Sequence, residues 1–156
     1  MNATVLIADH DFRIADATRR CLEAHGCDAV TATNGLQCLE QFMRIEPTVA
    51  VLDPDMQWGG GDGVLEWLIE QKLRMEPLIV VTEGPGCGHI LDRLQPWVDL
   101  RIHRPESLPE LQFFVTQLET VALWSKMIRG DSLSASEMRA SFEAPAHVKR
   151  VRDKSG

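Results

Sequence analysis

The chain has 156 residues, of which 44% are hydrophobic and 25% charged, and its formal net charge is −7 at pH 7. This composition predicts one globular domain with a hydrophobic core and argues against intrinsic disorder of the whole chain. The acidic balance argues against a nucleic-acid-binding surface over most of the chain.

The N-terminus lacks the basic region and long apolar run of a signal peptide, and no apolar stretch approaches the length of a membrane span. We therefore expect a cytoplasmic protein that does not contact a membrane. The spacing of the cysteines is not that of a zinc site, and we expect them to be reduced. They are Cys21, Cys27, Cys38 and Cys87.

Short apolar runs alternate with helical patterns along the first 130 residues. The runs predict strands at 4–8, 28–32, 48–53, 77–82 and 98–103. Apolar residues spaced three to four apart predict helices within 11–26, 35–47, 62–75, 88–95 and 107–130. This alternation predicts an α/β fold, a doubly wound five-stranded parallel sheet with five helices on its two faces.

The pattern changes after Gly130. We therefore expect one domain over 1–130 and a polar, solvated tail over 131–156. The spacing of Ser134 and Glu137 is that of a capping box, which predicts a short helix over 135–143. Four of the last ten residues are basic. A contact of these residues with nucleic acid or a partner is the less favoured alternative.

Polar side chains follow four of the five predicted strands. The carboxyl ends of parallel strands share one edge of a sheet, where ligands bind in this fold class. Carboxylates there are suited to Mg²⁺, and a hydroxyl and a guanidinium are suited to an oxyanion. Together they indicate phosphoryl transfer to an aspartate. The residues concerned are Asp9, His10 and Asp11 after the first strand, Asp53 and Asp55 after the third, Thr82 ending the fourth, and Arg104 after the fifth.

Each of these residues also has a purely structural explanation. Asp11 is a suitable N-cap for the first helix, and Asp55 is a common turn residue. Thr82 is a β-branched residue at the end of a strand, and Arg104 is an ordinary surface charge. The joint placement at successive strand ends favours a functional site over four separate coincidences.

The segments "VLIADHD", "VAVLDPDM", "PLIVVT" and "RIHRP" occur on the expected strands in the expected order. With them the chain resembles the receiver domain of two-component response regulators over residues 3–128. The resemblance implies a flavodoxin-like sheet with strand order 2-1-3-4-5. It also implies that Asp53 is the residue that a histidine kinase phosphorylates.

The resemblance further implies a Mg²⁺ site formed by Asp9, Asp53 and the backbone carbonyl of Asp55. In the family, the hydroxyl at the position of Thr82 moves to contact the phosphoryl group. A lysine that pairs with the phosphoryl group is replaced here by Arg104. An arginine keeps the charge but has a planar fork in place of a compact ammonium.

Several positions depart from the family pattern. His10 replaces the usual second acid, so we expect weak Mg²⁺ binding unless Asp11 substitutes for it. Arg101 occupies the position of the switching aromatic residue, and Glu83 replaces a small residue beside the site. The stretch "WGGG" lengthens the loop before Asp62, which we expect to cap the next helix.

Three functions remain as alternatives. The first is a stand-alone receiver, not an enzyme, that is phosphorylated by a sensor histidine kinase or phosphotransfer protein and signals by contacting a downstream protein. The second is a phosphorylation-independent interaction module. The third is a phosphatase, because "LDPD" resembles the Asp-x-Asp motif of haloacid-dehalogenase-type enzymes. The motif follows the third strand here, whereas in that family it follows the first, which disfavours this alternative.

Overall fold

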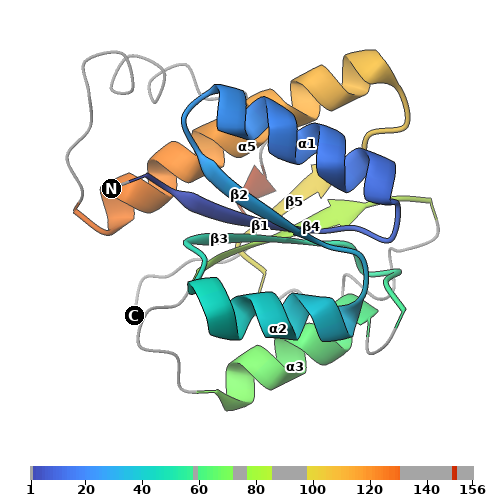
Figure 1. Cartoon of the computed structure of the whole chain (residues 1–156), viewed down its shortest axis with the longest axis vertical. Coiled ribbons are helices and arrows are strands. Elements are labelled where there is room, and N and C mark those ends of the chain that lie inside the picture. Colours follow the sequence, from blue (N-terminus) through green and yellow to red (C-terminus); the bar gives the residue numbers. More distant parts are fainter. Residues whose placement is uncertain (1, 58–59, 72–76, 86–97, 131–148, 151–156) are drawn as a thin grey trace.

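The computed structural model describes residues 2–57, 60–71, 77–85, 98–130 and 149–150. Its centre is a sheet with the order β2-β1-β3-β4-β5, in which all neighbouring strands are parallel (Figure 1). The predicted five-stranded parallel sheet is therefore confirmed. The strands are β1 (Thr4–Ala8), β2 (Asp28–Ala32), β3 (Val49–Leu52), β4 (Leu78–Glu83) and β5 (Leu100–His103).

Helices cover both faces of the sheet. One pair, α1 (Phe12–Ala24) and α5 (Leu108–Ile128), packs together on one face. The other pair, α2 (Gly35–Ile45) and α3 (Gly60–Glu70), packs together on the opposite face (Figure 1). Four of the five predicted helices are therefore confirmed. The one predicted within 88–95 and the short helix at 135–143 lie outside the described residues.

The core consists of two apolar layers, one on each side of the sheet. Alternate residues of a strand face opposite sides, so Val5 and Ile7 pack on the α1/α5 side and Leu6 on the α2/α3 side. Each of these side chains is at most 1% exposed. Burial on both faces explains why the strands read as continuous apolar runs. Cys38 of α2 belongs to the second layer, and burial raises the pKa of its thiol to about 12.

Local polar contacts define the helix ends. The side chains of Asp11, Asn34 and Ser107 accept backbone hydrogen bonds at the starts of α1, α2 and α5. Gly26 has a φ of 84° just after α1, a left-handed conformation that commonly ends a helix and that glycine adopts without strain. Short loops with fixed ends thus hold the polar residues at the carboxyl edge of the sheet.

The beginning of α3 differs from the prediction. The helix begins at Gly60 and not after Asp62, so Gly60 and Gly61 are helical, and Asp62 lies in the first turn instead of capping it. Glycine is a poor helix former but is sterically free to adopt helical dihedrals. Its low helix propensity is the reason that the sequence did not predict a helix beginning at Gly60.

A short sixth strand, β6 (Lys149–Arg150), pairs antiparallel with β5 at the edge of the sheet. It belongs to the segment expected as a tail, and the sequence did not predict it. Among the described residues, no helix is both long enough and apolar enough to cross a membrane.

Candidate functional site

The register of the sheet places the ends of β1, β3 and β4 side by side. Ala8 is the partner of Leu52, and Leu52 is the partner of Val81. The backbone N–H of Asp53 continues this ladder by donating to the carbonyl of Ala8 at 3.0 Å. Asp9, Asp53 and Thr82, each one position beyond these residues, therefore meet at the carboxyl edge, as the topology predicts.

Asp53 is a buried carboxylate that is held on both oxygens. It is 1% exposed. Its Oδ1 accepts a hydrogen bond from the backbone N–H of Asp55 at 2.9 Å. Its Oδ2 accepts one from the backbone N–H of His10 at 3.1 Å, and His10 Nδ1 contacts the same oxygen. The His10 ring, 45% exposed, therefore lies between this oxygen and solvent.

Asp9 is a second buried carboxylate, and its main partner is Arg104. The guanidinium donates two hydrogen bonds to the Asp9 carboxylate, from Nε to Oδ2 at 3.0 Å and from Nη2 to Oδ1 at 2.8 Å. Oδ1 also accepts from the backbone N–H of Asp11 at 2.7 Å. The hydrogen bonds to Asp9 raise the pKa of Arg104, and the charges of Asp9, Asp53 and Asp11 add to this shift. The arginine expected to hold a phosphoryl group is thus bound to a carboxylate of the site.

Asp11 contacts Asp9 through its backbone, but its carboxylate binds Arg13. Its Oδ1 caps α1 by accepting from the backbone N–H of Arg13 at 2.9 Å, and its side chain forms an ion pair with the Arg13 guanidinium. This hydrogen bonding to Arg13 lowers the pKa of Asp11. The structure therefore supports the capping role that the sequence allowed for Asp11.

Thr82 is buried beside the site, where its hydroxyl donates to the carbonyl of Leu52 at 3.5 Å. Glu83 follows on the other face of β4 and forms an ion pair with Arg101 of β5. An unpaired glutamate beside the site would repel a phosphoryl anion. The pairing of Glu83 with Arg101 offsets that negative charge. The two departures from the family pattern thus compensate each other.

Within the described part of the chain, three neighbouring side chains offer ligand atoms to one metal ion. Asp9, His10 and Asp53 each place one such atom within 4.8 Å of the other two. The arrangement is consistent with a receiver metal site, and the two carboxylates suit Mg²⁺. His10 was predicted to replace a ligand, not to be one. Its position directly after Asp9, on the loop that follows β1, was the signal available in the sequence.

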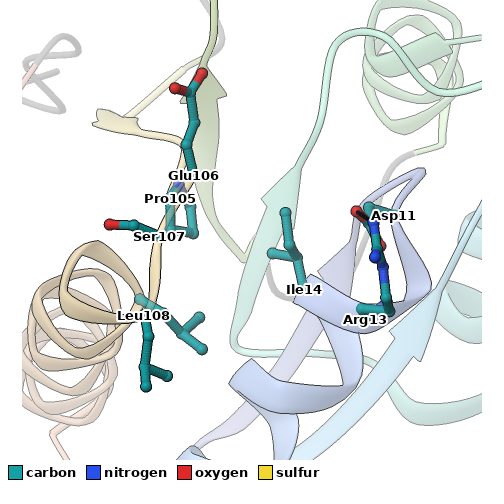
Figure 2. Close-up of a pocket in the computed structure, with 8 residues that line it drawn as sticks. Asp11, Arg13, Ile14, Pro105, Glu106, Ser107 and Leu108 are labelled. Atoms are coloured by element: carbon teal, nitrogen blue, oxygen red, sulfur yellow. Dashed lines mark hydrogen bonds and ion pairs between the residues drawn. The ribbon is translucent and has the colours of Figure 1, made fainter.

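A pocket of about 340 Å³ adjoins this edge of the sheet between the first turns of α1 and α5. Asp11, Arg13 and Ile14 line it on the α1 side (Figure 2). The segment from Pro105 to Leu108 lines the other side, and Pro105 directly follows Arg104. Both walls therefore continue from loops that carry residues of the site.

Comparison with solved structures identifies the fold. The Francisella response regulator 1452 receiver domain is 25% identical, and the match covers 73% of this chain and 93% of that one with a TM-score of 0.60. A signal receiver domain from Bermanella marisrubri is 23% identical, with 74% and 96% covered and a TM-score of 0.62. Chemotaxis response regulator CheY4 of Vibrio cholerae is 18% identical, with 78% and 99% covered and a TM-score of 0.64.

No protein-family model and no curated protein matches the chain. The sheet order, the two helical layers and the acidic group at the carboxyl edge define a doubly wound α/β domain with a potential ligand site. The structural matches identify this fold further as the CheY-like fold of receiver domains. Receiver domains are typically non-enzymatic signalling modules.

Proposed function

We propose that this chain is a response-regulator receiver that accepts a phosphoryl group on Asp53. The observation that carries the proposal is the position of this carboxylate, buried at the end of β3 beside Asp9 and Thr82. A carboxylate oxygen of Asp53 attacks the phosphorus of a phosphohistidine. The new P–O bond forms as the P–N bond breaks, and the imidazole leaves and takes up a proton.

Charge at the site supports this reaction. A divalent cation held by Asp9 and Asp53, with the carbonyl of Asp55 as a further ligand, would neutralise the charge on the transferring group. Arg104 would then turn from Asp9 to the phosphoryl oxygens, and the Thr82 hydroxyl would move to contact them. These roles stay predictions, as does the choice of Mg²⁺ as the cation.

The phosphodonor must bring its group to a carboxylate that is nearly covered. We assign its docking to the pocket between α1 and α5, because both walls lead directly to the site. Leu108, which is 70% exposed, and Ile14 provide an apolar contact there, with the charges of Asp11 and Arg13 beside it. The occupant would be a sensor histidine kinase or phosphotransfer protein in the cytoplasm. The output would be a contact with a downstream protein.

Phosphorylation is tested by incubating the full chain with acetyl phosphate and Mg²⁺ and measuring its intact mass. We expect the addition of one phosphoryl group, its loss in Asp53→Asn, and its retention in Asp28→Asn. The last variant is a matched control, because Asp28 is an exposed aspartate at the start of β2, at the opposite end of that strand from the site. Equal labelling of the wild type and Asp53→Asn would refute the assignment of Asp53.

One observation favours a second function, a phosphorylation-independent interaction module. Arg104 already neutralises Asp9, and His10 already covers Asp53. If this is the function, the wild type takes up no phosphoryl group, and Asp53→Asn binds the protein partner with unchanged affinity. Phosphorylation of Asp53 that alters partner affinity would exclude it.

A further inference from the structure

His10 brings a nitrogen ligand to two buried carboxylates. Its backbone N–H donates to Asp53 Oδ2 at 3.1 Å, which fixes the loop, and its Nδ1 contacts the same oxygen. The His10 side chain is 45% exposed, and its Nδ1 faces the Asp53 carboxylate. An ion bound there would take the place of the hydrogen between Nδ1 and Asp53, with Asp9 in reach as a third ligand.

This donor set discriminates between divalent ions. Mg²⁺ prefers oxygen ligands, whereas imidazole suits first-row transition ions such as Co²⁺, Ni²⁺ and Zn²⁺. We propose that His10 makes this site selective for such a transition-metal ion over Mg²⁺. This inference rests on the proposed function for its biological meaning. It deepens that function by naming the class of ion that binds beside Asp53.

The other charged groups at the site do not discriminate between divalent ions, so the selectivity of the site depends on His10. Asp9 and Asp53 bring two negative charges, and Arg104, bound to Asp9, brings one positive charge. Its repulsion weakens binding of every divalent ion alike. Asp11 adds no ligand to the group, because it is occupied in capping α1 and pairing with Arg13. The imidazole is therefore the feature that separates one divalent ion from another.

The test measures binding of Co²⁺ and Mg²⁺ to the full chain by calorimetry, without a phosphodonor. Oxygen sites also bind Co²⁺ somewhat better than Mg²⁺, so the decisive quantity is the ratio of the two affinities in wild type and variants. His10→Asn removes the ring nitrogen and keeps a polar side chain of similar length. His10→Asp replaces the ring with an oxygen ligand. His25→Asn is a matched control, because His25 is an exposed histidine that pairs with Glu119 elsewhere on the chain.

We expect His10→Asn to lower the Co²⁺/Mg²⁺ affinity ratio at least about tenfold, as loss of a metal-site interaction does elsewhere. His10→Asp should lower the ratio by strengthening Mg²⁺ binding, and His25→Asn should leave it unchanged. Visible absorption of bound Co²⁺ reports whether a cysteine thiolate coordinates instead. An unchanged ratio in both His10 variants, with thermal unfolding like that of the wild type, would overturn the inference, as would thiolate coordination.

The outcome is independent of phosphoryl transfer. If the ratio changes but Asp53 is labelled neither with Mg²⁺ nor with Co²⁺ present, the metal inference stands and the phosphoacceptor proposal fails. If Asp53 is labelled with Mg²⁺ and the ratio does not change, the reverse holds.

Discussion

Replacing Arg104 with alanine should destabilise the fold, because the Asp9 carboxylate would stay buried without its cation. The Asp9 side chain is 5% exposed and that of Arg104 is 19% exposed. Breaking a fully buried ion pair costs about 3–5 kcal/mol. The Arg104 side chain is partly exposed to solvent, which weakens the ion pair, so we expect a loss of about 2–3 kcal/mol in the free energy of unfolding. For a chain of this length that corresponds to a fall in Tm of roughly 5–10 °C.

The assay is urea unfolding followed by tryptophan fluorescence, with thermal unfolding as a second measurement. A double-mutant cycle with Asp9→Asn isolates the pair, and we expect a coupling energy of about 1–3 kcal/mol. Arg104→Lys should lose an intermediate amount, because an ammonium keeps the charge but cannot form the two-armed contact.

Arg13→Ala is the matched control. Arg13 also pairs with an aspartate of the same loop, Asp11, but its side chain is 89% exposed. Solvent screening should leave the stability of this variant close to that of the wild type. If Arg104→Ala is no less stable than Arg13→Ala, or if the cycle with Asp9 shows no coupling, the Arg104–Asp9 contact does not hold the site in the way described.

Four further predictions concern the surface, the second core layer and the first. Leu108→Glu should slow phosphoryl transfer from a protein donor at least about tenfold while labelling by acetyl phosphate is unchanged, whereas Met43→Glu, at an equally exposed position of α2, should slow neither reaction. Because burial raises the pKa of the Cys38 thiol from 9.0 to about 12, its alkylation by iodoacetamide in the native protein should be much slower than in urea. By the same shift, the contribution of Cys38 to stability should fall as pH rises through 9.0 towards 12, which urea unfolding of wild type and Cys38→Ala at several pH values can measure. Phe114→Ala should lose about 3–5 kcal/mol of stability in urea unfolding, and Phe113→Ala much less, because Phe114 is 2% exposed and its neighbour 47%.

The sequence predicted the sheet well, because each strand is buried on both faces and reads as an uninterrupted apolar run. The bounds predicted for β1 and β2, 4–8 and 28–32, agree with the structure. The edge that brings Asp9, Asp53 and Thr82 together also followed from topology, because the ends of parallel strands share one edge. The strands and the shared carboxyl edge of the sheet could therefore be predicted from the sequence alone.

The contacts within the site were not accessible in this way. The pair of Arg104 and Asp9 joins residues 95 positions apart, and their spacing in the sequence does not show which anion the arginine would bind. His10 was recognised as a substitution, but the turn of its ring onto Asp53 depends on the conformation of the loop after β1. The two residues of β6 pair through backbone groups, which leave no apolar signature in the sequence.

On the proposed function, activation would exchange one set of contacts at Asp9 and Asp53 for another. Asp9 and Asp53 are satisfied by groups of the chain itself, so a cation or a phosphoryl group gains only the difference between its own contacts and those it displaces. Release of Arg104 from Asp9 would remove one side-chain contact that holds the segment continuing through Pro105 into the start of α5. That segment forms one wall of the pocket between α1 and α5. On the proposed function, Arg104 would thus couple a change in charge at Asp53 to the surface assigned to the phosphodonor, and a donor bound there would favour or oppose the release of Arg104.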